Sequence, residues 1–316
     1  MSGALIAGFD AGQTHTTCRL ARRTADGSLI ALAEGQGPGV SHLAAPDGEE
    51  RFRAALGHSL AAALERGRLV GETPAAAGIG ASGIESGSSV QERGRQLAAT
   101  ALALDAGRVQ VSGDERTALR GAFGDAAGIL VISGTGCIAV GRDGQGREHR
   151  CGGWGWLLDG GGAAMDIGRD GLMRSVRMAD GREPETALRA MLWGELALST
   201  PQELKARVVR ADFGAAGFAA LAPCVDRLAV AGDPVARAII EASATALVDL
   251  VVGVAGALAL PAPAVAPVGG AIGHLQALRE EFERRLAARL PGARRHQPLG
   301  DACDGALRMA EGLLLS

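Results

Sequence analysis

Several residues near the start of the chain have the types and spacing of a phosphate-binding turn. An apolar stretch, residues 4–9, predicts a strand that delivers the Asp10 carboxylate onto a turn rich in Gly and Thr. Glycine lets a backbone approach an anion closely, and the N–H groups of such a turn form an anion-binding concavity. We expect Asp10 to hold Mg²⁺ and the turn to hold phosphate through Gly12, Gln13, Thr14 and Thr16. An ordinary β-hairpin with Asp and Gly at its turn remains an alternative for this segment alone.

A second segment, residues 128–140, repeats this plan. An apolar strand ends at Ser133, a short turn follows, and a second apolar strand begins at Cys137. The turn residues expected to contact phosphate are Gly134, Thr135 and Gly136. The same strand-turn-strand pattern in each half of the chain predicts two related α/β domains that bind a polyphosphate between them.

A further carboxylate, Asp114, lies between a predicted strand (residues 109–112) and a predicted helix (residues 117–123). In a mixed sheet, ligands gather outside the carboxyl ends of the parallel strands, so Asp114 is expected to face the ligand cleft. The alternative is that Asp114 only caps the helix, which is a common role for aspartate.

Residues 150–163 form a third segment, rich in glycine and containing two tryptophans. The glycines free the backbone for close approach of a ligand, and a tryptophan offers a flat apolar surface suited to one face of a sugar. Trp156 as a core residue, and a flexible loop without function, are the alternatives to a sugar site.

Other nucleotide motifs are excluded. Residues 78–83 match G-x-G-x-x-G after a strand, but a loop follows where a dinucleotide fold needs a helix N-terminus. No Walker A motif is present, and Lys205, the only lysine, follows no glycine loop. A nucleotide site in this chain must therefore hold phosphate without lysine.

The composition is that of a soluble globular enzyme, with 47% hydrophobic and 21% charged residues among 316. A net charge of −3 argues against nucleic acid as a partner. The five cysteines have no C-x-x-C spacing, so we expect reduced thiols and no metal cluster. The first residues lack the basic region of a signal peptide, and the apolar stretch 250–260 is too short to cross a membrane, so we expect a cytoplasmic protein without membrane insertion.

The order of predicted elements favours a mixed sheet covered by helices in each half. Three strands open the chain, and helices then alternate with strands up to residue 112. The second half begins with strands, becomes mostly helical over residues 162–257, and has a late strand at 264–268 followed by a helix to about 290. A closing helix, residues 304–315, is expected to return to the first domain.

Taken together, these segments resemble the N-acetylglucosamine kinase and BadF/BadG-type ATPase family of the actin-like, sugar kinase and Hsp70 superfamily. The resemblance spans nearly the whole chain. The two turns look like the family's phosphate motifs, with Cys137 where Ser is usual, and Val268-Gly269-Gly270-Ala271 looks like its adenosine motif. Cys151-Gly152-Gly153-Trp154-Gly155 is similar to its Gly-Gly-Trp-Gly signature, which is the more specific marker.

The resemblance implies an α/β fold of two actin-like (RNase H-like) domains, with nucleotide and sugar in the cleft between them. It implies an N-terminal domain over residues 1–115, joined by a helix at about 301–316, and a C-terminal domain over 116–300. It also implies that Asp114 is the catalytic base and that Gly269 and Gly270 bind nucleotide. The residues it places at the sugar are His42, Gly153, Trp154 and Asp159.

The implied function is an ATP- and Mg²⁺-dependent amino-sugar kinase, acting on the 6-hydroxyl of N-acetylglucosamine or glucosamine. A homodimer is among the assemblies expected. The chain departs from the family pattern in one segment that is expected to contact the substrate. Where the family has Leu-Gly-Asp-Glu-Gly-Ser, this chain has Leu158-Asp159-Gly160-Gly161-Gly162-Ala163. Two alternatives stay open: an ATPase coupled to a protein partner, as in dehydratase activators, and a degenerate sugar-binding protein without catalysis.

Overall fold

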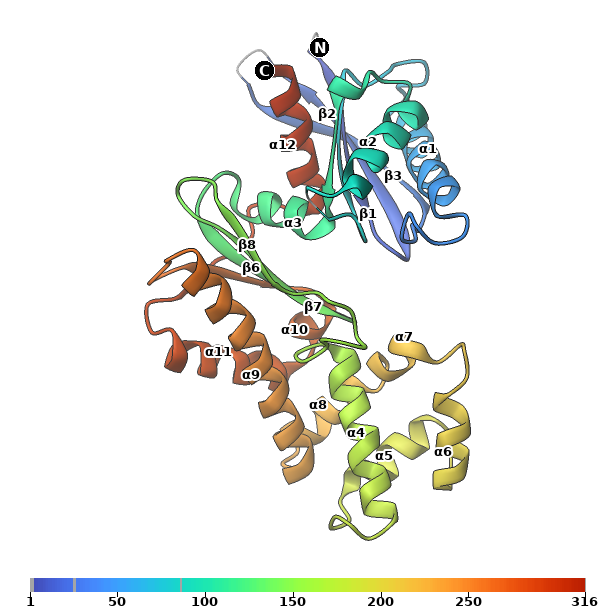
Figure 1. Ribbon diagram of the computed structural model, residues 1–316, viewed down its shortest axis with the longest axis vertical. Helices are drawn as coiled ribbons and strands as arrows, with labels where there is room; N and C mark the ends of the chain where they lie inside the picture. Colours follow the sequence, from blue (N-terminus) through green and yellow to red (C-terminus); the bar gives the residue numbers. More distant parts are fainter. Residues whose placement is uncertain (1–2, 25–26, 86, 316) are drawn as a thin grey trace. The chain divides into compact units, whose positions relative to one another are not determined.

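The computed structural model describes residues 3–24, 27–85 and 87–315 of the chain. It divides into two compact units, coloured along the sequence in Figure 1. Unit 1 comprises Met1–Ala126 and Gln297–Ser316, and unit 2 comprises Ala127–His296. The division falls after helix α3 (Asp114–Phe123) rather than at residue 115, because α3 packs against the C-terminal helix α12 (Ala302–Leu315) of unit 1.

Unit 1 is built on a five-stranded mixed sheet with the order β3-β2-β1-β4-β5. The strands are β1 (Leu5–Ala11), β2 (His15–Arg23), β3 (Leu29–Pro38), β4 (Ala76–Ala81) and β5 (Val109–Gly113). The first three strands pair antiparallel, whereas β4 and β5 run parallel to β1. The carboxyl ends of β1, β4 and β5 therefore meet at one edge of the sheet.

Helices cover both faces of this sheet. On one face, α1 (Gly48–Arg66) and α2 (Ser89–Leu102) bury Phe52, Leu56 and Leu97 in the core, and a short 3₁₀ turn, η1 (Ala106–Arg108), leads into β5. On the other face, α12 lies so close that a Cβ at Gly8 would come within 2.6 Å of the Cys303 carbonyl oxygen. Small residues in the central strands thus let the C-terminal helix pack directly on the sheet.

Unit 2 repeats the same topology, with the order β10-β9-β6-β7-β8. Its strands are β6 (Gly128–Ser133), β7 (Cys137–Arg142), β8 (Glu148–Gly152), β9 (Ala264–Val268) and β10 (Arg294–Arg295). Again the first three strands are antiparallel and the last two are parallel to the first. Two mixed sheets flanked by helices confirm the predicted fold class. The sequence did not predict β8, which is short and largely half-buried, or β10, which is short and exposed.

The region expected to be mostly helical over 162–257 contains six helices among the described residues. They are α4 (Ala164–Ala179), α5 (Ala187–Glu195), α6 (Pro201–Val208), α7 (Gly214–Ala219), α8 (Ala222–Val230) and α9 (Pro234–Ala257). The helix predicted to reach residue 290 is two helices, α10 (Gly270–His274) and α11 (Gln276–Arg289), because the backbone is extended at Leu275.

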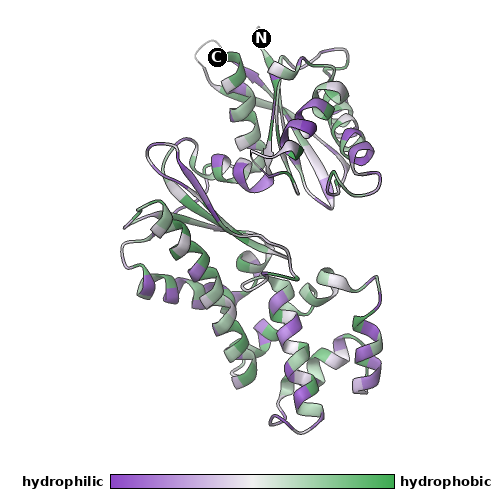
Figure 2. Cartoon of the chain, in the orientation of Figure 1, coloured by the Kyte–Doolittle hydropathy of each residue, from purple (hydrophilic) through white to green (hydrophobic). Residues whose placement is uncertain are grey.

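Helix α9 is the central helix of unit 2. By length and composition it is the one helix among the described residues that is apolar enough to cross a membrane. Its buried face, including Leu247, Val251 and Val254, lies in the unit 2 core. Figure 2 shows α9 mostly in hydrophobic green, whereas its neighbour α11 carries hydrophilic patches. The apolar character of α9 is therefore that of a core helix.

Candidate active site

The first phosphate turn joins β1 to β2 in unit 1. The Gly12 N–H donates to the His15 carbonyl oxygen at 3.1 Å, and the Gly12 carbonyl accepts from the Val40 N–H at 3.0 Å. Gln13 and Thr14 are exposed, and their N–H groups donate to no acceptor within the described part of the chain. An anion at this turn would therefore be held by the N–H groups of Gln13 and Thr14. The hairpin already uses the Gly12 N–H group, and the expected contact of Gly12 with phosphate stays a prediction.

Thr16 lies one step inside the same hairpin. Its side chain is completely buried, on the face of β2 that also carries Cys18 and Leu20. The Thr16 Oγ1 atom has no hydrogen-bond partner among the described residues. Since this hydroxyl faces the core, Thr16 is left out of the phosphate contacts predicted above.

Two carboxylates, Asp10 and Asp114, are close enough to interact at the carboxyl ends of the parallel strands of unit 1. Burial, followed by the charges of Asp114 and Asp301, raises the pKa of Asp10 to about 6, although His15 opposes this rise. Burial also raises the pKa of Asp114 above its ordinary value. A cation would relieve the crowding of negative charge here, because an opposite charge favours the ionised form.

Asp114 is not the N-cap residue of α3, and hydrogen bonds hold its carboxylate in place. The preceding residue, Gly113, is the N-cap of α3, and the Asp114 Oδ1 accepts from the N–H of Glu115 at 3.0 Å. The Ser82 hydroxyl donates to the Asp114 carboxylate, and the Gln13 amide contacts the Ser82 oxygen at 3.5 Å. Ser82 thus links the phosphate turn to the candidate base. Only the position of Ser82 directly after β4 could have predicted this role.

His42 is exposed at the same edge of unit 1. Its Nδ1 accepts from the Ala44 N–H at 3.2 Å, and its Cδ2 faces Gly83 of the loop after β4. The segment that carries His42 packs tightly on the phosphate turn, because a Cβ at Gly39 would lie 2.1 Å from the Gln13 carbonyl oxygen. His42 is therefore brought near the Gln13 and Ser82 side of the site.

In unit 2, the second phosphate turn and the glycine loop form a single structure. The Ser133 hydroxyl donates to the Gly162 carbonyl at 2.7 Å, and the Cys137 thiol donates to the Gly161 carbonyl at 3.0 Å. The Ala164 N–H donates to the Gly134 carbonyl at 2.9 Å. The sequence predicted these as two separate motifs, whereas the fold joins them through three hydrogen bonds.

The second turn resembles the first, because its first glycine also donates its N–H within the hairpin and the residues that follow are exposed. The Gly134 N–H donates within the turn to the Gly136 carbonyl at 2.8 Å, while Thr135 and Gly136 are exposed. Burial, with the charges of Asp159 and Asp166, raises the pKa of the Cys137 thiol to about 12. The thiol is therefore neutral at physiological pH and serves as a hydrogen-bond donor.

The second turn and the Gly-Gly motif both line a cavity of about 310 Å³ in unit 2. Gly269 must be glycine, because its φ is +107° and a Cβ would lie 2.4 Å from the Ser133 carbonyl oxygen. The cavity is mostly apolar, which suits a flat base and its ribose. Its lining, which sequence reasoning predicted only in part, is Gly134, Thr135, Ala164, Ala219, Ala222, Pro223, Gly270, Ala271, His274 and Leu275.

The tryptophan segment, which the sequence predicted to face a sugar, is exposed to solvent. Trp154 is 58% exposed, and the Arg150 guanidinium lies over its ring, 4.5 Å from the centroid. Trp156 is 40% exposed and its ring centroid is 6.5 Å from that of Phe218, so Trp156 is not a core residue. Gly153 has a φ of +77°, a backbone conformation that favours glycine.

Two acids lie in or beside the glycine loop. Asp159 is half-buried, and its Oδ2 lies near Gly152. Asp166, which the sequence did not single out, is buried at the start of α4, where it accepts from the Gly162 N–H at 3.4 Å and pairs with Arg169 at 2.5 Å. Burial and the charge of Asp170 raise the pKa of Asp166 to about 6. Asp166 therefore anchors the loop to its helix.

The chain is similar in sequence to a known protein family and to two curated sugar kinases. The model of the BadF/BadG/BcrA/BcrD ATPase family matches residues 7–306. The N-acetylmuramic acid/N-acetylglucosamine kinase of Clostridium acetobutylicum is 30% identical over 206 residues, which cover 65% of this chain and 67% of that protein. The N-acetyl-D-glucosamine kinase of Dictyostelium discoideum is 30% identical over 60% of each chain.

Solved structures of sugar kinases are similar to this chain. One from Chromobacterium violaceum, named as an N-acetylglucosamine kinase, has a TM-score of 0.76 at 27% identity and covers 98% of this chain and 100% of that one. A glucokinase of the ROK family from Streptomyces griseus, at 18% identity over 98% of this chain and 99% of that one, shares the fold with a TM-score of 0.61. The predicted actin-like fold and the predicted enzyme class, a carbohydrate kinase, are confirmed. The chain belongs to the BadF/BadG/BcrA/BcrD ATPase family.

Proposed function

We propose that this protein is an ATP-dependent amino-sugar kinase that phosphorylates the 6-hydroxyl of N-acetylglucosamine or glucosamine. The observation that carries the proposal is the half-buried Asp114 carboxylate, held by Ser82 beside Asp10 and the first phosphate turn. The glycine cavity of unit 2 supports an adenine nucleotide, and the exposed Trp154 supports a sugar. The names of the relatives support the N-acetylated hexosamine.

In this mechanism Asp114 accepts the proton of the attacking hydroxyl. Burial raises the pKa of the Asp114 carboxylate, which makes the ionised form a stronger base than an ordinary aspartate. The Ser82 hydroxyl fixes the orientation of the carboxylate. The N–H groups of Gln13 and Thr14, and the hydroxyl and N–H of Thr135, would stabilise charge on the transferred phosphoryl group and its neighbours.

The residues present fit a magnesium ion bound mainly through nucleotide and water. No group of three or more His, Cys, Asp or Glu side chains able to hold a metal occurs among the described residues. Mg²⁺ is commonly held by one or two carboxylates together with substrate phosphates, and Asp10 would supply that carboxylate. When bound, the ion would neutralise charge on the phosphate oxygens.

A sugar-dependent assay of ADP release tests the proposal. N-acetylglucosamine, glucosamine, N-acetylmuramic acid and glucose are compared with buffer, and the product is identified by mass spectrometry. We expect release with one of the amino sugars and formation of its phosphate. Lack of turnover with 6-deoxy-N-acetylglucosamine would support the 6-hydroxyl, whereas phosphorylation of that analogue would contradict it.

The same assay separates the two alternatives. An ATPase coupled to a protein partner releases ADP without sugar once that partner is present. A non-catalytic sugar-binding protein binds sugar by calorimetry but releases no ADP. Either result would overturn the kinase proposal.

A further inference from the structure

A groove lies on unit 2 between helices α4, α6 and α7, and neither the phosphate turns nor the glycine loop lines it. Its volume is about 560 Å³, within the usual range for small-molecule sites of roughly 300 to 1,000 Å³. Apolar side chains form most of its surface, among them Leu172, Met173 and Val208. The cavity is thus large and apolar enough to take the alkyl part of a small molecule.

The sequence of α4 explains why this groove is apolar. Leu172 is buried in the unit 2 core, whereas its neighbour Met173 is 57% exposed and lines the groove. On α6, Leu204 is the one residue buried, so the rest of this short helix contributes its side chains to the groove or to solvent. An exposed methionine on an apolar surface is typical of sites that adapt to a ligand.

The two charged residues that line the groove are both basic. Arg169 forms ion pairs with Asp166 at 2.5 Å and with Asp170 at 3.6 Å. Lys205 makes no ion pair or hydrogen bond with any of the residues that the structure describes, and it is exposed. An apolar surface with an unpaired ammonium group beside it is complementary to an alkyl chain that ends in a carboxylate.

We propose that this groove binds a small amphipathic carboxylate, with its alkyl chain against Met173 and Val208 and its carboxylate on Lys205. Phe218 of α7 also lines the groove, and its ring centroid is 6.5 Å from that of Trp156 in the tryptophan segment. Occupancy of the groove therefore changes the surroundings of Trp156. None of the residues proposed to take part in phosphoryl transfer lines the groove, so binding is measured without turnover.

The first experiment titrates the full chain with decanoate and follows binding by calorimetry and tryptophan fluorescence. Decanol and decyltrimethylammonium have the same alkyl chain with a neutral or a cationic head. We expect one saturable site for decanoate and binding at least tenfold weaker for the cation. The variant Trp156→Phe should keep the calorimetric affinity and lose most of the fluorescence change. Equal affinity for decanoate and decyltrimethylammonium, or many unsaturable sites, would overturn the proposal.

Variants then locate the site. Lys205→Gln should weaken decanoate binding about three- to tenfold and leave decanol unchanged, while Lys205→Arg restores it. Met173→Asp should weaken decanoate binding at least tenfold. The matched control is Val209→Asp, because Val209 directly follows α6 and is 75% exposed but does not line the groove. Equal loss in Met173→Asp and Val209→Asp would contradict the assignment.

Because Lys205 is the only lysine, an amine-reactive reagent followed by peptide mapping reports on this side chain alone, apart from the N-terminal amine. We expect Lys205 to react readily in the free protein and to be protected by decanoate but not by decyltrimethylammonium. Protection of Lys205 without any ligand, together with a dimer in solution, would show that a second copy of the chain covers the groove and would refute the proposal.

Discussion

At the scale of single residues, Asp114 carries the proposed chemistry. It is half-buried, accepts from Ser82 and the Glu115 N–H, and has a raised pKa. Asp114→Asn keeps the shape but cannot accept a proton, so kcat should fall by roughly 10² or more while nucleotide binding persists. Steady-state kinetics and calorimetry with ATP check this. Near-normal kcat would leave Asp114 with only a structural role at the start of α3.

Asp10→Asn is the matched variant, since it removes the neighbouring carboxylate. It should weaken the response to Mg²⁺, whereas Asp114→Asn should not.

The pH dependence of the native enzyme follows from the pKa of Asp10, raised to about 6. Both carboxylates act in the ionised form, so kcat/KM of the native enzyme should fall as pH drops through about 6 rather than through the ordinary aspartate range. An acid limb near pH 4 would contradict this reading.

Gly160 is the residue at which this chain lacks the family's acid. Its backbone is outside the left-handed region, and a Cβ there would meet chiefly the flexible Met165 Cε at 2.6 Å. Gly160 and Met165 are both buried, so the Met165 methyl group must move aside in Gly160→Asp. The variant should then lower KM for an amino sugar about ten- to a hundredfold, the effect of a hydrogen bond to a charged group. Gly162→Asp is the control expected to misfold, because Gly162 has a φ of +100° and its Cβ would lie 2.5 Å from Leu247 Cγ. An unchanged KM would show that Asp159 already contacts the sugar.

At the scale of elements, hydrogen bonds from Ser133 and Cys137 of the β6–β7 hairpin hold the glycine loop. Cys137→Ser keeps a donor and should retain activity. Cys137→Val leaves the Gly161 carbonyl without this donor and should lower kcat/KM about tenfold. Cys18→Val, which replaces a buried thiol in the unit 1 core, is the control and should leave kinetics unchanged. Equal activity of Cys137→Val and Cys137→Ser would show that the thiol only fills space.

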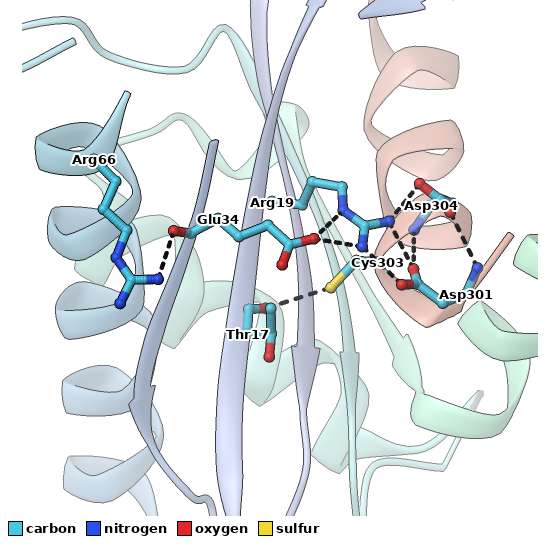
Figure 3. Close-up of polar contacts among 7 residues, drawn as sticks. All are labelled: Thr17, Arg19, Glu34, Arg66, Asp301, Cys303 and Asp304. Atoms are coloured by element: carbon cyan, nitrogen blue, oxygen red, sulfur yellow. Dashed lines mark hydrogen bonds and ion pairs between the residues drawn. The ribbon is translucent and has the colours of Figure 1, made fainter. Parts of the chain in front are cut away.

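At the scale of the whole molecule, Arg19 ties the C-terminal segment to the first sheet. Figure 3 shows its guanidinium between Glu34 of β3 and Asp301 and Asp304 at the start of α12. The distances are 2.5 Å to Glu34, 2.7 Å to Asp301 and 2.5 Å to Asp304. The Arg19 side chain is largely buried, so its loss would leave three carboxylates facing one another.

Arg19→Met should accordingly lower the free energy of unfolding by about 2 kcal/mol, less than for a fully buried pair because the acids are partly exposed. Arg23→Met is the control on the same strand, since among the described residues Arg23 forms an ion pair with Glu311 of α12 alone, and it should cost about 1 kcal/mol or less. Urea unfolding measures both, and hydrogen exchange in α12 should increase more for Arg19→Met. Similar losses for the two variants would argue against the three-acid arrangement.

The sequence by itself determined the motifs and the main elements of unit 1. Apolar stretches of strand length next to Gly and Thr turns predicted the hairpins at Asp10 and Ser133, and apolar spacing predicted α1 and α2. The Gly-Gly-Trp-Gly signature predicted the family, because it constrains several neighbouring residues at once. These features are local, so they are readable from neighbouring residues alone.

Only the tertiary structure decided which of these groups face a ligand and which serve the fold. Thr16 is buried and the Gly12 N–H is used by its own hairpin, since strand pairing sets the direction of each group. Ser82, Asp166 and the apolar lining around Pro223 and His274 come from segments distant in sequence, which strand order and helix packing bring together. Such contacts depend on sheet topology, and topology is a property of the whole folded unit rather than of any stretch of sequence.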